Sequence, residues 1–398
     1  MKTSKILKAS LVAAAASAAC LAHAGGTFQQ GYAFTSSTDP QSTGIWPEWE
    51  LTADGTGYMW GVTTRGGTSN GGAIFKTNNA GVATHVYTFG SSGSSAGAWP
   101  SGPLLHSGAN FYGVATSGGT GGHGVLYYWN TSSAYHVAHS FTGTDGSAPS
   151  GPLLLATDGN IYGTTQNGGA CGQGEVFKLV PSTLALSVVH SFCGQEGASP
   201  ITGVIQATDG ALYGTAYTGG DYGKGTLFKL TLAGAFTRLR VFGQTVLDPA
   251  YPSRLVQGRN GLLYGTSMRG GYNTDVASQP GTIYSATLAG VLASNTSLEF
   301  VPAANPTWRA ALNERFTGIF YGVSNGSDEG HVFQFRASNN TVTNIFSFST
   351  LGYAHGYPQG GLTLGADGNL WGTESDGELG GPYSAGHLYE IVGLTANP

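Results

Sequence analysis

Charged residues are scarce in this sequence of 398 residues, at 9% of the chain. The formal net charge is −5, and no dense cluster of lysines or arginines stands out in the body of the chain. Proteins that bind nucleic acid need basic side chains to neutralise phosphates, so the composition argues against a nucleic-acid partner. The scarcity does not indicate disorder, because hydrophobic residues make up 40% of the chain and can fill a large core.

Long hydrophobic runs are also missing. The N-terminal run from Leu11 to Leu21 is too short for a transmembrane helix, and we find no later segment that would span a bilayer. Three lysines precede this run and Ala22-His23-Ala24 follows it, which predicts a secretory signal peptide over residues 1–24. Lipidation at Cys20 is the weaker alternative, because Ser17 stands where a lipobox has leucine.

Cleavage after residue 24 leaves residues 25–398 as a single domain with 13 basic and 21 acidic residues. We therefore expect a secreted or periplasmic protein without a membrane-spanning segment. Only two cysteines remain in it, Cys171 and Cys193. In an oxidising compartment we expect them to form a disulfide, which adds roughly 3 kcal/mol in the chain-entropy model. Two buried thiols are the alternative.

Glycine is abundant, with 66 residues, and it recurs in a fixed context. An aromatic residue followed by Gly and then Thr or Val occurs seven times, at intervals of 50 to 57 residues. The anchoring aromatics are Trp60, Tyr112, Tyr162, Tyr213, Tyr264, Tyr321 and Trp371. Such a period indicates a repeat architecture in which each copy is one supersecondary unit.

Each copy also carries the same local signals. A proline precedes the aromatic by 12 to 15 residues, and an Asp-Gly or Asn-Gly pair, typical of two-residue hairpin turns, often stands between them. The segments separated by these signals predict four short strands per copy. We attribute the glycine after the aromatic to sheets that pack face to face.

Seven units of four strands predict an all-β, seven-bladed β-propeller. The last copy ends after its third strand at residues 387–391, whereas residues 27–34 match a fourth strand with no strands before it. We therefore expect the N-terminal strand to close the last blade, which leaves no unpaired sheet edge there.

The segment "DGNIYGTTQNGGACGQGEVFKL" resembles the repeats of the GloVer (Gloeo-Verruco) tandem-repeat family, secreted and surface-anchored bacterial proteins. The resemblance extends over about residues 28–391. It implies the propeller fold and a soluble secreted or periplasmic form, since the C-terminal anchor of many members is missing. It implies no particular activity, because the family has no agreed one.

Function is expected where copies depart from the shared pattern. After the strand-one proline copies two, three and seven have Ser-Gly or Gln-Gly, but copies one, five and six have large polar or aromatic residues: Glu48, Trp49, Glu50, Arg254, Trp308 and Arg309. Strand one lines the channel of a propeller, so these residues predict a ligand site at its mouth. Tryptophan stacks on sugar rings, while Arg and carboxylates bind polar groups. The alternative is that both tryptophans pack between blades.

The loop after strand two gives a second set of departures. Copies six and seven lose the Gly-Gly pair and gain acids, and each has a histidine at the start of strand three: Asp328, Glu329, His331, Asp376, Glu378 and His387. Acids and histidine suit acid–base catalysis or a bound divalent cation, although the spacing matches no known metal motif. The alternative is greater tolerance to change in the closing blades.

Three functions remain open from the sequence. The first is a monomeric binding module for an extracellular polymer, above all a glycan, or for a cell-surface protein. The second is a polysaccharide lyase or hydrolase with its site on blades 6, 7 and 1. Its tentative catalytic residues are Glu48, Glu50, Arg309, His331 and His387. The third is a structural surface protein with no small ligand.

Overall fold

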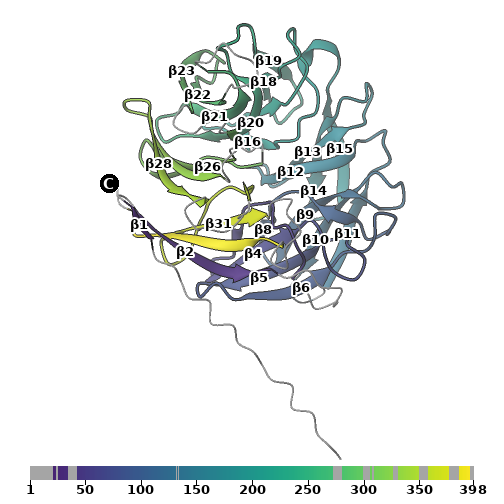
Figure 1. Cartoon of the computed structure of the whole chain (residues 1–398). Coiled ribbons are helices and arrows are strands. Elements are labelled where there is room, and N and C mark those ends of the chain that lie inside the picture. The colour runs from purple at the N-terminus through teal and green to yellow at the C-terminus, as the bar shows by residue number, and fades with distance from the viewer. Residues whose placement is uncertain are drawn as a thin grey trace, which may run out of the picture.

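Seven antiparallel sheets surround a common centre in the computed structural model, so the fold is a seven-bladed β-propeller (Figure 1). The predicted fold class is confirmed. The structure describes residues 21–23, 26–34, 43–130, 132, 134–271, 280–298, 305–306, 309–325, 330–348, 357–375 and 385–394. In these residues the helical content is one 3-10 turn, η1 (Gly194–Glu196), and no helix is long and apolar enough to cross a bilayer.

Blades 1 to 4 follow one another along the chain, and each is ordered from the centre outward. Blade 1 contains β3 (Thr52–Ala53), β4 (Tyr58–Thr63), β5 (Ala73–Asn78) and β6 (Ala83–Thr88). Blade 2 contains β7 (Ala98–Pro100), β8 (Leu105–Ser107), β9 (Asn110–Ser117), β10 (Val125–Asn130) and β11 (Ala134–Ser140). Blade 3 contains β12 (Ser147–Leu155), β13 (Ile161–Asn167), β14 (Glu175–Val180) and β15 (Ala185–Ser191). Blade 4 contains β16 (Val204–Gln206), β17 (Leu212–Ala216), β18 (Thr226–Leu230) and β19 (Phe236–Val241).

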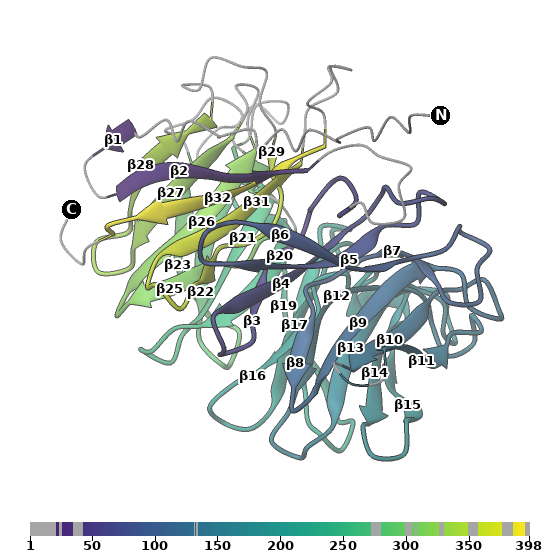
Figure 2. The ribbon, with the colours of Figure 1, turned by 90° about the horizontal axis from the view of Figure 1, so that it is seen from below.

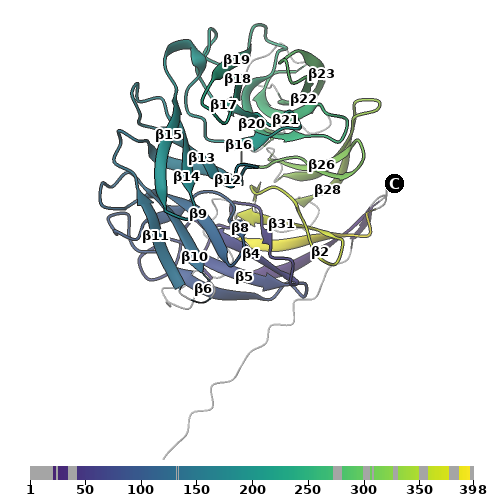
Figure 3. The same ribbon diagram turned by 180° about the vertical axis from the view of Figure 1, so that it is seen from behind.

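Blades 5 and 6 continue the ring, and the inner strand of blade 6 is divided into two segments, as in blade 2. Blade 5 contains β20 (Ala250–Gln257), β21 (Leu263–Arg269), β22 (Thr282–Ala286) and β23 (Leu292–Ser297). Blade 6 contains β24 (Asn305–Pro306), β25 (Asn313–Phe316), β26 (Ile319–Asn325), β27 (His331–Arg336) and β28 (Thr341–Ser347). Seen from behind, inner strands such as β12, β16 and β20 again surround the centre (Figure 3).

Blade 7 is built from both ends of the chain. Its C-terminal part contains β29 (Tyr357–Pro358), β30 (Thr363–Leu364), β31 (Leu370–Ser375) and β32 (His387–Val392). The fourth strand is β2 (Gly26–Ala33), which pairs antiparallel with β32 and lies beside it in Figure 2. The predicted closure by the N-terminal strand is therefore confirmed. A short strand, β1 (Leu21–His23), pairs with the outer edge of β2.

The glycine of strand two is required by the aromatic ring opposite it in strand three. Gly163 pairs with Phe177 across β13 and β14, and a Cβ on Gly163 would lie 2.4 Å from the Phe177 ring. The same relation holds at the equivalent glycine of every blade, where the partner is always Phe or Tyr. The close approach thus comes from the partner strand of the same blade, whereas we had attributed it to packing between sheets.

The turn between strands one and two is tied to the anchoring aromatic. Asp158 accepts a hydrogen bond from the Tyr162 hydroxyl (2.8 Å) and another from the Asn160 amide (3.1 Å). Although burial acts against it, these bonds hold the pKa of Asp158 below its usual value. Only Gly159 has a positive φ, at 78°, and its N–H donates to the carbonyl of Ala156. The predicted two-residue turn is wrong here, because this is a three-residue hairpin loop with a left-handed glycine.

Neighbouring blades pack through seven hydrophobic clusters, one at each boundary. At the boundary of blades 2 and 3, for example, Val114 and Leu126 pack with Leu153 and Phe177. A second contact joins the strand-one proline to the glycine before strand three of the preceding blade. A Cβ on Gly174 would lie 2.7 Å from the ring of Pro200. The repeated proline and glycine are therefore parts of the scaffold.

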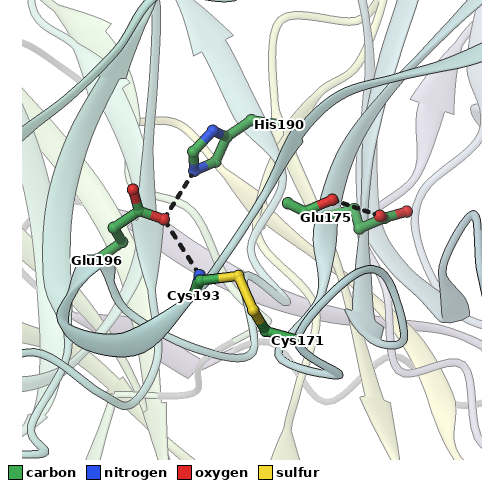
Figure 4. The surroundings of a disulfide bond; sticks show 6 residues. Cys171, Glu175, His190, Cys193 and Glu196 are labelled. Carbon is green, nitrogen blue, oxygen red and sulfur yellow. Dashed lines mark hydrogen bonds and ion pairs between the residues drawn. A yellow bond between two sulfur atoms is a disulfide. The ribbon is translucent and has the colours of Figure 1, made fainter.

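The predicted disulfide is present and joins Cys171 to Cys193 with a Cα–Cα distance of 5.4 Å (Figure 4). It links the loop after β13 to the loop that leads into blade 4. The Glu196 carboxylate supports the same loop. It accepts a hydrogen bond from the Cys193 amide (3.1 Å), and it lies 3.2 Å from His190 Nε2. Burial lowers the pKa of His190 despite this carboxylate.

Candidate ligand-binding site at the channel mouth

A cavity of about 300 Å³ lies at the inner rim of the ring, where strand two ends in blades 1 to 3. Thr64, Thr116 and Gln166 occupy equivalent positions in these three blades, and all three line the cavity. The full lining consists of Trp46, Glu48, Trp49, Thr64, Arg65, Trp99, Ser101, Thr116, Ser150, Gln166 and Arg309. The sequence-predicted residues Glu48, Trp49 and Arg309 are thus brought together in one cavity.

The residue before the strand-one proline has a left-handed backbone conformation in blades 1 to 5. Its φ is 61° in Trp46 and Trp99, and 52° to 58° in the equivalents Ala148, Ser199 and Tyr251. This conformation is unfavourable for residues other than glycine. A hydrogen bond to the preceding blade accompanies it, as from the Trp99 amide to the carbonyl of Gly71 (2.8 Å). The contact between blades therefore directs these side chains, which are large in blades 1 and 2 but small in blades 3 and 4.

Two tryptophans and an arginine form one wall of the cavity. Trp46 is 38% exposed. Arg65 lies over the Trp99 ring, with its Cζ atom 4.3 Å from the ring centroid. The indole N–H of Trp99 donates to the carbonyl of Asn70 (3.3 Å). Cation–π contact and hydrogen bonding together hold the guanidinium and this indole in place.

Glu48 and Arg309 form an ion pair between blades 1 and 6. Glu48 Oε1 lies 2.7 Å from Arg309 Nη1, and the two side chains are 15% and 20% exposed. The second carboxylate oxygen, Oε2, accepts a hydrogen bond from the Thr64 hydroxyl (2.6 Å). Both oxygens of Glu48 are therefore engaged within the protein, which fixes the orientation of the carboxylate.

A second ion pair lies further along the inner strands and joins blades that are not neighbours. Arg254 of β20 donates to Glu50 Oε1 and also to the main-chain carbonyl of Arg309 (3.1 Å). The Glu50 and Arg254 side chains are 14% and 12% exposed. Blade 7 leaves room for this arrangement, because a Cβ on Gly360 would lie 2.8 Å from the Glu50 amide. The pair thus connects the inner parts of blades 1 and 5.

Trp49 is a core residue as well as part of the cavity wall. It is 1% exposed and belongs to the cluster between blades 1 and 2, with Val62 and Leu104. Its ring also lies 5.6 Å from the Arg309 guanidinium. The structure therefore shows the packing between blades that we had weighed as the alternative for this tryptophan.

The two predicted histidines do not line the cavity. His331 is 3% exposed at the start of β27, and its Nδ1 lies 3.2 Å from Asn344 Nδ2. His387 begins β32, and its Nδ1 lies 2.7 Å from Oε1 of Glu374, which is 1% exposed. Both histidines thus pair within their own blades.

The remaining predicted ligand residues lie outside the residues that the structure describes. These are Trp308, Asp328, Glu329, Asp376 and Glu378. Among the described residues, no group of three or more His, Cys, Asp or Glu side chains is arranged to hold a metal ion. A bound divalent cation at the acidic loops of blades 6 and 7 stays a prediction. The same holds for the signal peptide, of which only Leu21–His23 is described.

The family of this chain is indicated by its repeat pattern, its closed ring and its split blade. A model of the Gloeobacter/Verrucomicrobia repeat matches residues 19–155, 91–277 and 149–389. The chain belongs to the Gloeobacter/Verrucomicrobia repeat family. No curated protein matches the sequence.

Solved structures similar to this repeat protein have diverse descriptions. One is a fungal alcohol oxidase in complex with copper, with a TM-score of 0.53 and 14% identity over 91% of this chain and 76% of that chain. Another is a putative 6-phosphogluconolactonase from Bacteroides uniformis, with a TM-score of 0.51 and 15% identity over 79% of this chain and 88% of that chain. At such low identity they support the fold alone.

Our sequence reasoning predicted only Glu48, Trp49 and Arg309 of the cavity lining in this Gloeobacter/Verrucomicrobia repeat protein, and the largest residues that it missed are Trp46, Trp99 and Arg65. We compared the positions after the strand-one proline and not the position before it, where the two tryptophans stand. Arg65 was missed because it lies next to a Gly-Gly pair that copies one to five share. The equivalent residues in blades 2 to 4 are Ser117, Asn167 and Thr218, and blade 5 has Arg269, so the sequence shows an arginine at this position in two copies.

Proposed function

We propose that this protein is a glycan-binding module whose ligand enters the cavity at the channel mouth. The observation that carries the proposal is the composition of the cavity wall. Indole surfaces at Trp46 and Trp99 lie beside the polar groups of Arg65, Thr116 and Gln166. A sugar presents a C–H face and a rim of hydroxyls, so it needs both kinds of surface.

The engaged state of the carboxylates favours binding over cleavage. Glycosidases use a pair of carboxyl groups that act on the substrate. Here Glu48 is bound by Arg309 and Thr64, and Glu50 is bound by Arg254. Both oxygens of Glu48 are engaged, whereas Glu50 Oε2 is buried without a hydrogen-bond partner among the described residues and Glu50 does not line the cavity. A lyase or hydrolase is therefore the second candidate, and it depends on blades 6 and 7.

The proposed location and partner of the protein are consistent with glycan binding. We propose a secreted or periplasmic protein, because the Cys171–Cys193 disulfide fits an oxidising compartment. An extracellular polysaccharide is then the expected partner. A cell-surface protein partner and a purely structural role are the alternatives if no polysaccharide binds in the experiment below.

Affinity electrophoresis of the purified protein through gels that contain soluble neutral and acidic polysaccharides tests the proposal. We expect retardation by at least one polymer, and we expect Trp46→Ala to weaken the affinity at least about tenfold because it removes a stacking surface. Tyr58→Ala is the matched control, because Tyr58 is 43% exposed at the opposite end of β4.

The other outcomes decide between the alternatives. New reducing ends, or absorbance from unsaturated sugars, would replace the binding module by an enzyme. Migration that no polymer changes would overturn glycan binding and leave the protein-partner and structural roles. Equal loss of affinity in Trp46→Ala and Tyr58→Ala would mean that the ligand does not bind in the cavity.

A further inference from the structure

Arg65 carries a positive charge that no acidic group in the described residues compensates. Its Nη1 atom is buried and has no hydrogen-bond partner there. The ion pairs of the described residues leave out Arg65, whereas Arg309, the other arginine of the cavity, is paired with Glu48. Arg65 is half-buried in the cavity lining, and a buried guanidinium nitrogen without an acceptor is unfavourable. Its presence in a cavity wall therefore points to an external acceptor.

The guanidinium is also held in a fixed position before any ligand arrives. The Arg65 main chain pairs with Ile45 in both directions, with N···O distances of 2.8 and 3.1 Å. Its side chain lies on the Trp99 ring at 4.3 Å. An arginine that is already ordered loses little conformational entropy when it binds, and its planar fork fits a carboxylate with two parallel hydrogen bonds.

The groups around Arg65 fit a sugar ring that carries this carboxylate. Trp46, with 38% exposure, offers a stacking surface from the neighbouring segment of blade 1. Thr116 and Gln166 add a hydroxyl and an amide from blades 2 and 3. Glu48, the acid of the cavity, is turned toward Arg309 and Thr64, so it does not compensate Arg65.

We infer that the cavity selects acidic glycans, and that Arg65 binds the carboxylate of a uronic acid residue. This inference rests on the proposed glycan-binding function and names its ligand class. Sulfate esters are a second source of negative charge on a glycan. The guanidinium fork accepts both kinds of oxyanion with two parallel hydrogen bonds, so the experiment includes a sulfated polymer to separate the two sources.

The test compares polygalacturonate, alginate and hyaluronan with the same polymers after their carboxylates have been reduced to alcohols. Carrageenan supplies sulfate without carboxylate. We expect at least one uronate polymer to bind ten- to hundredfold more tightly than its reduced form, the range for one charge-assisted hydrogen-bonded pair. Arg65→Gln should abolish this preference and leave the weaker affinity for the reduced polymer unchanged.

Arg269→Gln is the matched control, because Arg269 occupies the equivalent position in blade 5 and is absent from the cavity wall. It should retain the full preference. Equal affinity for a polymer and its reduced form would overturn the inference and keep glycan binding. Tighter binding of carrageenan than of every uronate would assign Arg65 to sulfate instead. Failure of all polymers to bind would overturn both the inference and the proposed function.

Discussion

The inner strands of blades 2 to 4 and those of blades 1, 5 and 6 fill the centre of the ring in different ways. In blades 2 to 4 the backbones meet directly, and a Cβ on Gly102 would lie 2.2 Å from the carbonyl oxygen of Gly151. In blades 1, 5 and 6 the contact is made by the charged side chains of Glu50 and Arg254, and Arg254 also donates to the main-chain carbonyl of Arg309. The residues shared by all copies thus determine the blade, whereas the residues that fill the centre differ from copy to copy.

The difference explains why the cavity is polar and lies on one side. Where backbones meet, the residues directly after the strand-one proline that border the mouth are small, namely Ser101 and Ser150. Where charged side chains fill the centre, they bring their ion pairs to the mouth, as Arg309 does with Glu48. The cavity is lined by residues of both regions. Blades 2 and 3 contribute uncharged residues, whereas the charged residues come from blades 1 and 6.

The largest effect is expected from the ion pair across the channel. Arg254→Met leaves the Glu50 carboxylate without its partner in a site where it is 14% exposed. Loss of one member of a buried pair costs about 3 kcal/mol or more. We therefore expect the free energy of unfolding in urea, followed by circular dichroism, to fall by about 3 kcal/mol.

The double variant Glu50→Gln/Arg254→Met separates the pair from the shape of the site. It removes both charges, so it should regain more than half of the lost stability. If the single and the double variant unfold at the same urea concentration, charge pairing does not stabilise this side of the ring.

A smaller effect is expected where the backbones meet. Gly151 and Gly159 both have a positive φ, of 84° and 78°. A Cβ on Gly151 would lie 2.6 Å from the carbonyl oxygen of Ile201, whereas a Cβ on Gly159 would meet nothing within 4 Å. Gly159→Ala should therefore lower stability by about 1 kcal/mol, and Gly151→Ala by about 2 kcal/mol. Equal losses in urea unfolding would mean that the blades can separate slightly at no cost.

The smallest effect concerns one repeat position that differs in charge between blades 4 and 7. In blade 4, Lys229 pairs with the turn residue Asp209 (2.8 Å). The equivalent residue in blade 7 is Glu390, which is near the turn residue Asp367. Burial and, secondarily, this negative charge raise the pKa of Glu390 to about 7, although Asn369 donates a hydrogen bond to it.

Because the folded state holds this proton more tightly than the unfolded state, stability should fall as the pH rises from about 4.5 to 7. Glu390→Gln removes that loss. Its melting temperature should exceed that of the parent by roughly 2–4 °C at pH 8 and match it at pH 4. Glu390→Lys restores the ion pair of blade 4 and should gain at least as much at pH 8. A constant difference at all pH values would contradict the role of ionisation.

The fold was predictable because its determinants are local and recur. The aromatic-glycine pair, the turn acid and the strand-one proline each act within one blade or on the next one. The disulfide was predictable because two cysteines remain after the predicted cleavage. The turn type was wrong, since Asp-Gly serves both kinds of hairpin and the sequence does not reveal whether Asp158 has a positive φ.

The site was predictable only in part. Departures from the repeat identified Glu48, Glu50, Arg254 and Arg309, but not their partners. The ion pair of Arg254 with Glu50 joins strands of non-neighbouring blades, and no local pattern encodes which charges meet across a channel. His331 and His387 depart from the repeat equally clearly, yet they pair within their own blades. A departure therefore indicates relaxed scaffold requirements, and only the three-dimensional arrangement shows whether a site results.

The split blade has a consequence for how the chain folds. Phe28 of β2 pairs with Ile391 of β32, so the strands that close the ring are separated by almost the entire chain. Contacts of such long sequence separation form slowly, because loop closure must precede them. During synthesis, β2 has no partner until the ribosome has released the C-terminal strands. The N-terminal segment must therefore be kept from pairing with other strands until β32 (His387–Val392) has been synthesised, which makes ring closure the expected late step of folding.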